Sequence, residues 1–143
     1  MAFYLSHDRK VIVAINLHDH LMITVQSNTS DLHEVYGRLT RIMVQMDCLL
    51  EFQQHSRLGY RTFSPLDLGI TLQINVQIRL LYYDDRDRES LTILVSNLDI
   101  DVDDTPEIMI YNLSNSTWLG RTEFHIIRGM RDAIQKILDN DLK

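Results

Sequence analysis

The chain has 143 residues, a formal net charge of −6 and 45% apolar residues. This length suffices for one domain with its own core, and the composition is ordinary for a soluble globular protein. No apolar run approaches the roughly 20 residues that cross a bilayer, so no membrane association is predicted. The acidic balance disfavours nucleic acid as a partner, because a phosphate backbone is bound mainly by Lys and Arg.

The single cysteine, Cys48, has no partner for a disulfide within the chain, which fits a reducing compartment. The N-terminal segment MAFYLSHDRK lacks the apolar core of a signal peptide. We therefore expect a protein of the cytosol or nucleus. Because the sequence contains no internal repeat and no Pro/Gly-rich linker, residues 1–143 are predicted to form one domain.

The first predicted elements are two strands and a helix. Residues 11–17 (VIVAINL) and 21–26 (LMITVQ) form apolar or alternating runs separated by a short HDH segment, which is typical of a β-hairpin. Asp31 and Glu34 then form a capping-box pattern ahead of apolar residues at helical spacing, up to about residue 52. We expect this amphipathic helix to lie over one face of a sheet.

Residues 56–80 read SRLGYRTFSPLDLGITLQINVQIRL and organise the middle of the chain. They predict a strand over 59–64, a tight bend at Ser-Pro-Leu-Asp-Leu-Gly, and a second strand over 71–83. Between Thr71 and Leu80 polar and apolar residues alternate strictly, as in a strand with one buried face.

Beyond residue 84 the sequence predicts a short helix over 88–96, a strand around 98–102, an acidic loop, a strand over 108–113 and a helix over 122–139. The apolar stripe of this last helix comprises Phe124, Ile127, Met130, Ile134 and Ile137. Strands that are adjacent in sequence and interrupted by three helices predict an α+β fold, in which an antiparallel β-sheet is flanked by helices on one side.

Three segments resemble signatures of a known family, the phosphagen (guanidino) kinases, which include arginine and creatine kinase. LGYRTFSPLDLG followed by INVQIRL is similar to the family pattern L-G-[FY]-x-T-x-C-P-[TS]-N-L-G and its following basic strand. NLHDHLMITVQ resembles the family's N-E-E-D-H-L-R-[IV] hairpin, and IYNLSNSTWLGRTEF resembles its last motif. The resemblance implies a degenerate form of the family's C-terminal catalytic domain, an antiparallel sheet flanked by helices, with the N-terminal helical domain absent.

The resemblance also implies an active site, and five positions of this site depart from the family. The guanidinium-orienting Glu falls on His18, the phosphate-binding Arg of the hairpin on Met22, and a further phosphate-binding Arg on Gln73. The reactive Cys falls on Ser64, and an Asn of the bend falls on Asp67. Phosphoryl transfer to a guanidino nitrogen needs cations around the nucleotide phosphates and carboxylates on the guanidinium. These replacements predict a pseudoenzyme of the ATP:guanidino phosphotransferase family.

A third part of the implied site is a loop with another phosphate-binding Arg and a guanidinium-binding Glu. Here the corresponding segment reads LDIDVDDTPE, and no Arg lies between Arg88 and Arg121. Glu107 supplies a carboxylate in this segment. The loop therefore gives no substitute for the cations that the hairpin and the strand lack.

Other candidate sites have plainer interpretations. His18 and His20 lack a third ligand, and the aspartates of 99–104 lack the Gly and the terminal Glu of an EF-hand loop, so no metal is predicted. Ser64 has no Gly-x-Ser-x-Gly elbow around it, which favours a structural bend over a nucleophile. Trp118 is either a partner-binding anchor or a residue packed beneath the last helix, and the sequence leaves both open.

Two functions follow from the sequence. The first is a catalytically inactive domain that serves as a protein-protein interaction or dimerisation module, with a protein partner or a second copy of the chain, and with no cofactor. The alternative is a fragment of an ATP:guanidino phosphotransferase, arginine kinase-like, that retains nucleotide binding while a further domain supplies the remaining contacts. This alternative predicts that ADP stabilises the fold.

Overall fold

The computed structural model describes residues 1–81, 88–117 and 119–141. The chain packs as two compact units, Met1–Gly69 (unit 1) and Ile70–Lys143 (unit 2). Each unit is described by itself below. The expectation of one domain over residues 1–143 stays a prediction.

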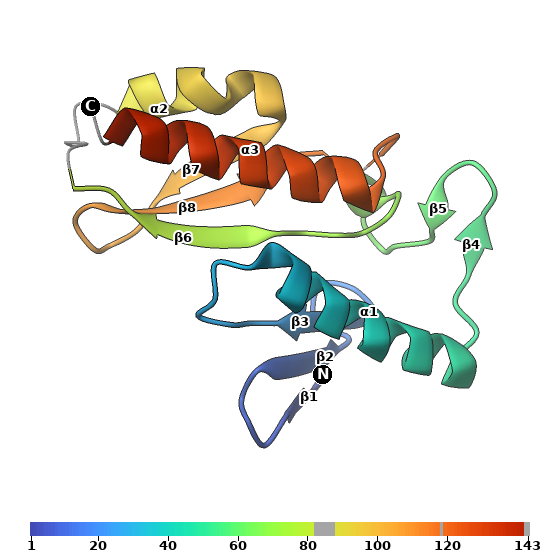
Figure 1. Ribbon diagram of the computed structural model, residues 1–143. Helices are drawn as coiled ribbons and strands as arrows, with labels where there is room; N and C mark the ends of the chain where they lie inside the picture. The colour runs from blue at the N-terminus through green and yellow to red at the C-terminus, as the bar shows by residue number, and fades with distance from the viewer. Residues whose placement is uncertain (82–87, 118, 142–143) are drawn as a thin grey trace. The chain divides into compact units, whose positions relative to one another are not determined.

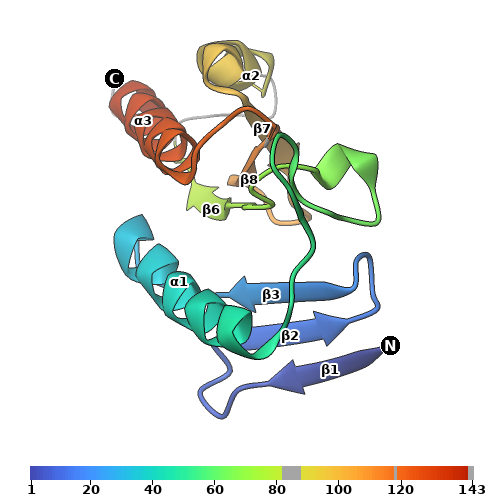
Figure 2. The same cartoon turned by 90° about the vertical axis from the view of Figure 1, so that its right-hand side faces the viewer.

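Unit 1 contains a three-stranded antiparallel sheet and one long helix (Figure 1). The strands β1 (Ala2–Leu5), β2 (Val11–Ile15) and β3 (Leu21–Val25) pair in the order β1-β2-β3. β2 and β3 form the predicted hairpin, with Val11 opposite Val25 and Ile15 opposite Leu21. β1 adds an outer strand to this hairpin (Figure 2).

The helix α1 (Leu32–Leu49) begins where the sequence predicts. The Asp31 carboxylate accepts hydrogen bonds from the backbone N–H groups of His33 (2.9 Å) and Glu34 (3.4 Å), which caps donors that a helix start otherwise leaves unpaired. The helix packs against β3, but none of residues 32–49 is fully buried. The apolar stripe of α1 is therefore only half covered.

The predicted strand over 59–64 is shorter in the structure. A two-residue strand β4 (Gln54–His55) pairs with β5 (Gly59–Tyr60), and a 3₁₀ turn, η1 (Pro65–Asp67), follows. Gly59 has a φ of 75°, and a Cβ at this position would lie 2.3 Å from the carbonyl oxygen of Gly69. The strand ends at Tyr60 because the backbones of Gly59 and Gly69, on either side of the Ser64–Asp67 bend, approach each other closely, which only glycine allows.

Unit 2 is a second three-stranded antiparallel sheet covered by helices. Its strands β6 (Asn75–Arg79), β7 (Ile100–Asp104) and β8 (Ile110–Asn115) pair in the order β6-β8-β7. The helices α2 (Arg88–Val95) and α3 (Glu123–Asp141) lie on the same side of this sheet (Figure 1). A 3₁₀ turn, η3 (Ser96–Leu98), connects α2 to β7. The α+β fold with antiparallel strands and helices on one side is thus confirmed.

The alternation predicted along residues 71–80 is present. Leu72 and Leu80 are buried, and the apolar residues between them are half-buried, whereas the polar residues face solvent. The hydrogen-bonded part of this strand, β6, spans only Asn75–Arg79. Before it, Thr71 takes a left-handed φ of 55°, and the backbone groups of residues 72 and 74 bond to the Asn115 side chain instead of to a neighbouring strand. Residues 82 and 83 of the predicted strand lie outside the described residues.

The core of unit 2 lies between the sheet and both helices. Its largest fully buried side chains, each less than 2% exposed, are Leu80, Leu91, Val95, Leu113, Met130 and Ile137.

Two details of the predicted core are wrong. Phe124 is 64% exposed, because α3 buries Ile126 and Met130 and Phe124 lies roughly 160° around the helix axis from Ile126. The strand predicted around 98–102 continues to Asp104 as β7, so Asp103 and Asp104 of the predicted acidic loop lie on a strand, after the buried Ile100 and Val102. Period-two alternation, and not charge, decides the structure here.

Across the described ranges, no helix combines the length and the apolar character that crossing a membrane requires.

Candidate functional site

The hairpin of unit 1 carries two of the five positions that the resemblance singles out. His18 is exposed in the turn between β2 and β3, which the Asn16 N–H closes by donating to the His20 carbonyl at 3.1 Å. Met22 lies on β3 opposite Ala14 and is 38% exposed. At the position where the resemblance implies a cation, the sheet therefore presents an uncharged thioether.

Asp19 connects this hairpin to the central bend. One carboxylate oxygen accepts from the backbone N–H of His20 at 2.6 Å, and the other accepts from the backbone N–H of Phe63 at 3.2 Å. The turn that carries His18 therefore lies beside the segment that carries Ser64. No pattern in the sequence predicts this role of Asp19, although the residue lies inside the HDH segment of the predicted hairpin.

The bend itself is held by backbone acceptors. The Ser64 carbonyl accepts from the Thr62 hydroxyl at 2.7 Å and from the Asp67 N–H at 3.1 Å. Ser64 is half-buried, whereas Asp67 is exposed at the end of η1. Asp67 thus adds a solvent-facing negative charge to this part of unit 1.

Gln73 lies in unit 2, in the extended segment before β6, and its side chain is exposed. Asn115 fixes the backbone on both sides of it. Its Oδ1 accepts from the Ile74 N–H at 2.7 Å, and its Nδ2 donates to the Leu72 carbonyl at 3.1 Å. Asn115 is only 4% exposed, so a buried amide of the IYNLSN motif determines how the chain presents Gln73.

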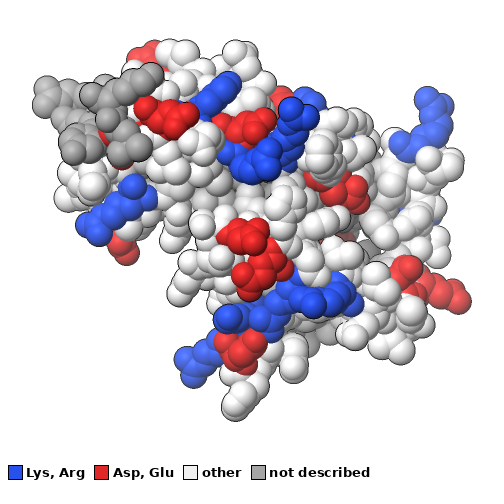
Figure 3. Space-filling model, in the orientation of Figure 1, with Lys and Arg blue, Asp and Glu red and all other residues white. Residues whose placement is uncertain are grey.

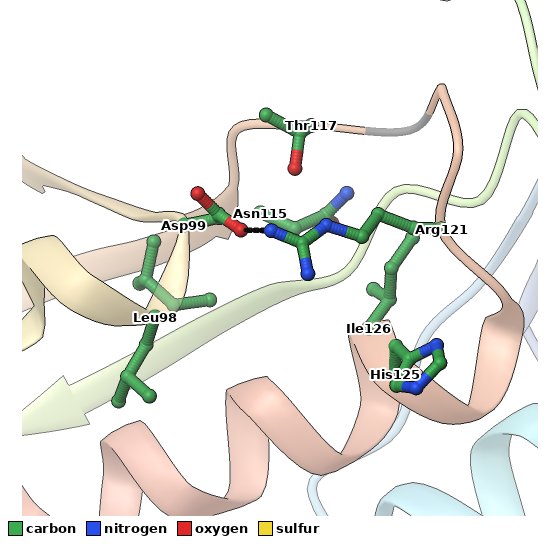
Figure 4. A pocket seen from close by; sticks show the side chains of 8 residues that line it. Leu98, Asp99, Asn115, Thr117, Arg121, His125 and Ile126 are labelled. Carbon is green, nitrogen blue, oxygen red and sulfur yellow. Dashed lines mark hydrogen bonds and ion pairs between the residues drawn. The ribbon is translucent and has the colours of Figure 1, made fainter.

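A small cavity of about 30 Å³ lies in unit 2 between the end of β8 and the start of α3 (Figure 4). The Arg121 guanidinium points to Asp99 and forms an ion pair with it. At the first turn of α3, the Thr122 hydroxyl accepts from the His125 N–H at 3.3 Å. Drug-sized ligands occupy pockets of roughly 300–1,000 Å³, so this cavity is about tenfold too small for a nucleotide.

A larger open groove of about 490 Å³ lies in unit 1 between β1, β2 and α1. Its cation is Arg38, which forms an ion pair with Asp8 at 2.5 Å. A hydrogen bond from the Ser6 hydroxyl, together with Arg38, holds the pKa of the Asp8 carboxyl well below its ordinary value. The other residues that line this groove are Tyr4, Ser6, Val11, Val13, Ile42, Gln45 and Met46.

Arg121 at the small cavity and Arg38 at the larger groove are therefore each paired with a carboxylate. On the face drawn in Figure 3, basic and acidic side chains of the described residues are interspersed. Within the same described part of the chain, no group of three or more His, Cys, Asp or Glu side chains is placed to hold a metal ion. Trp118, the candidate partner anchor, lies outside the described residues.

The antiparallel sheets, the helices packed on them and the three motifs that they carry agree with the guanidino kinase-type catalytic domain that the resemblance implies. The chain belongs to this family: residues 1–143 match the ATP:guanido phosphotransferase, C-terminal catalytic domain. It is similar to the arginine kinases of Penaeus monodon (31% identical) and Artemia franciscana (32% identical) over 141 residues. Each match covers 94% of this chain and 39% of the relative, so the chain spans about two fifths of these relatives' length.

Solved structures agree with this assignment. The substrate-free duplicated taurocyamine kinase from Schistosoma mansoni matches with a TM-score of 0.87 and 25% identity, over 98% of this chain and 20% of that chain. Lombricine kinase matches with a TM-score of 0.85 over 98% of this chain and 41% of that chain. At 19% identity, this second match supports the fold alone.

Proposed function

We propose that the chain is a catalytically inactive member of its family and serves as a protein-protein interaction module. One observation carries the proposal: the two positions at which the resemblance implies phosphate-binding Arg are occupied by Met22 and Gln73, neither of which carries charge. A single transition-state Arg is worth roughly 10³–10⁵ in the rate of phosphoryl transfer. The loss of two such cations removes measurable turnover.

The surroundings of the remaining groups support this proposal. Arg121 is already paired with Asp99, and the cavity beside it has about 30 Å³. Asp67 brings a negative charge to the bend, where anionic phosphate would be repelled. His18 replaces a carboxylate that would orient a guanidinium.

The residues that hold the backbone have been kept while those of the chemistry have changed. Gly59 and Gly69 close the bend, and Asn115 clamps the strand beside Gln73. A scaffold that keeps its shape after losing its charged site suits binding to another protein, in the cytosol or nucleus and without a cofactor.

A turnover assay tests the loss of catalysis. The chain is mixed with MgATP and, in separate reactions, arginine or taurocyamine, and ADP release is followed by a coupled enzyme system. We expect no release above the blank without protein. The double variant Met22→Arg/Gln73→Arg, which places a positive charge at both positions, is the matched control for the effect of charge. Turnover by the unmodified chain overturns the proposal.

A second candidate function is retained nucleotide binding. The favouring observation is that the Asp19 link still joins the hairpin to the bend, while the chain spans only two fifths of its arginine kinase relatives. Other contacts to phosphate would then come from a further domain. Because a ligand that binds only the folded state raises its stability, this candidate predicts a higher melting temperature in millimolar MgADP. An unchanged melting temperature rejects it.

A further inference from the structure

We propose that two copies of the chain associate edge to edge through β1, antiparallel, with Tyr4 on the two-fold axis. The two three-stranded sheets of unit 1 then form one continuous six-stranded sheet. This inference rests on the binding role proposed above and names the partner as a second copy of the chain.

The outer edge of β1 is open. Among the described strands, β1 pairs only with β2, which lies between it and β3 (Figure 2). The Ser6 N–H donates to the Val11 carbonyl at 2.9 Å, so the N–H of Ser6 points toward β2. Hydrogen-bonded and non-hydrogen-bonded pairs alternate along an antiparallel ladder. The backbone N–H and C=O groups of Phe3 and Leu5 consequently point away from β2, toward the open edge.

The residues of β1 favour pairing with another strand. Exposed edge strands in natural proteins are usually blocked by charged side chains, proline or a bulge, and Ala2–Leu5 has none of these. Phe3 is 60% exposed, Tyr4 62% and Leu5 52%. The nearest carboxylate, Asp8, lies in the turn beyond the strand and is occupied by Ser6 and Arg38.

A second copy fits this edge because the pattern is self-complementary. With Tyr4 on the axis, Phe3 of one copy lies opposite Leu5 of the other, and the reverse pair forms by symmetry. The open donors and acceptors at both positions then meet in four hydrogen bonds. Phe3 packs against Leu5 of the second copy on one face of the new sheet, and the two Tyr4 side chains meet on the other. No like charges are brought together within the strand.

The size of this contact predicts a weak dimer. Covering the exposed parts of Phe3, Tyr4 and Leu5 on both copies removes at most on the order of 600 Å² from water, which is below the roughly 1,000 Å² of a stable interface and corresponds to a weak, transient contact. We expect a dissociation constant on the order of 100 µM. The dimer therefore forms only at high protein concentration or where the chain is locally concentrated.

Cysteine cross-linking tests the register. In a Cys48→Ser background, Tyr4→Cys places two thiols on the axis in a non-hydrogen-bonded pair with Cα atoms about 4.5 Å apart, which a disulfide spans. Ala2→Cys is the matched control on the same strand. In the proposed register the two Ala2 positions lie roughly 13 Å apart, beyond the reach of a disulfide. Mild oxidation should yield a covalent dimer from Tyr4→Cys and only monomer from Ala2→Cys.

Sedimentation equilibrium tests the association without a cross-link. The unmodified full chain should shift from monomer toward dimer between about 10 and about 500 µM. Phe3→Lys should remove this shift, because it places a charge against Leu5 of the second copy, next to the axis. Val44→Lys, at a position 60% exposed on α1, should leave the shift unchanged.

Three results would overturn the proposal: an unmodified chain that stays monomeric throughout, equal cross-linking at positions 2 and 4, or a dimer that survives Phe3→Lys. Because turnover and MgADP binding are measured independently of association, a strict monomer would contradict the β1 dimer and leave the loss of catalysis standing.

Discussion

The two units of this chain differ in how completely each buries its own apolar side chains. Unit 2 buries apolar side chains from β7, β8, α2 and α3, together with Leu72 and Leu80 on either side of β6, around one core. Among the described apolar side chains of unit 1, only Val11 and Ala14 are fully buried. Unit 2 is stabilised by its own packing, whereas unit 1 presents apolar surface that another molecule or another part of the chain can cover.

The changes in chemistry follow the same division. Four of the five departures from the family's site, His18, Met22, Ser64 and Asp67, lie in unit 1, and only Gln73 lies in unit 2. Unit 1 thus carries most of these departures and also has the more exposed sheet. This coincidence is what a domain converted from catalysis to binding would produce.

The largest expected effect is on the core of unit 2. Leu113→Ala, on the central strand β8, removes a side chain with no exposed surface and should lower the free energy of unfolding by about 3 kcal/mol. The matched change in unit 1 is Ile42→Ala, on the half-covered face of α1, and should cost about 1 kcal/mol. Urea unfolding measures both values. Equal losses would contradict the contrast between the units.

The next effect concerns the clamp beside Gln73. Asn115→Ala leaves the Ile74 N–H and the Leu72 carbonyl without their side-chain partner and should cost about 2 kcal/mol. Asn112→Ala, on the same strand but half-buried, is the control and should cost about 0.5 kcal/mol. If the two variants melt alike, the buried amide does not hold this segment.

A smaller effect is expected at the link between hairpin and bend. Asp19→Ala removes the acceptor of the Phe63 N–H and should weaken local protection by about 1 kcal/mol, which is roughly fivefold faster amide exchange at Phe63. Asp67→Ala changes an exposed carboxylate of the same bend and should leave that rate unchanged. Amide hydrogen exchange followed by NMR distinguishes the two outcomes.

The smallest effect is a pH dependence at the β1–β2 turn. The pKa of Asp8 is lower in the folded chain than its ordinary 3.8, because the Ser6 hydroxyl and Arg38 favour the charged carboxylate. Its contribution to stability is therefore complete above pH 3.8 and is lost as the pH falls below 3.8 toward the folded value. We expect the amide signals of Lys10 and Val11 to move only at such acidic pH. Asp8→Asn should abolish that movement; a transition near neutral pH would contradict the assignment.

Local patterns in the sequence predict much of this fold. The alternation from Thr71 to Leu80 and the Asp31 cap are confirmed, because each depends on residues close together in the chain. Phe124 was misplaced because a helical stripe can be drawn through several sets of residues, and only the position of the sheet selects one. The division of the strands among separate sheets has a similar origin, since strand pairing depends on long-range contacts.

The candidate site shows the same limit. The identities at Met22 and Gln73 are visible in the sequence alone, and the family membership that gives them meaning is confirmed. The role of Asp19 was missed because its partner Phe63 is 44 residues away, and the pairing of Arg121 with Asp99 spans 22 residues. Residue type indicates which charge is present; only the fold determines which groups neutralise it.

The central claim is that the chain, with Met22 and Gln73 at two positions where the resemblance implies Arg, does not hold the phosphates of a nucleotide. Isothermal titration calorimetry of the full chain with MgADP into the millimolar range tests it directly. The account predicts heats equal to those of dilution alone. A saturable curve with one site per chain would contradict it.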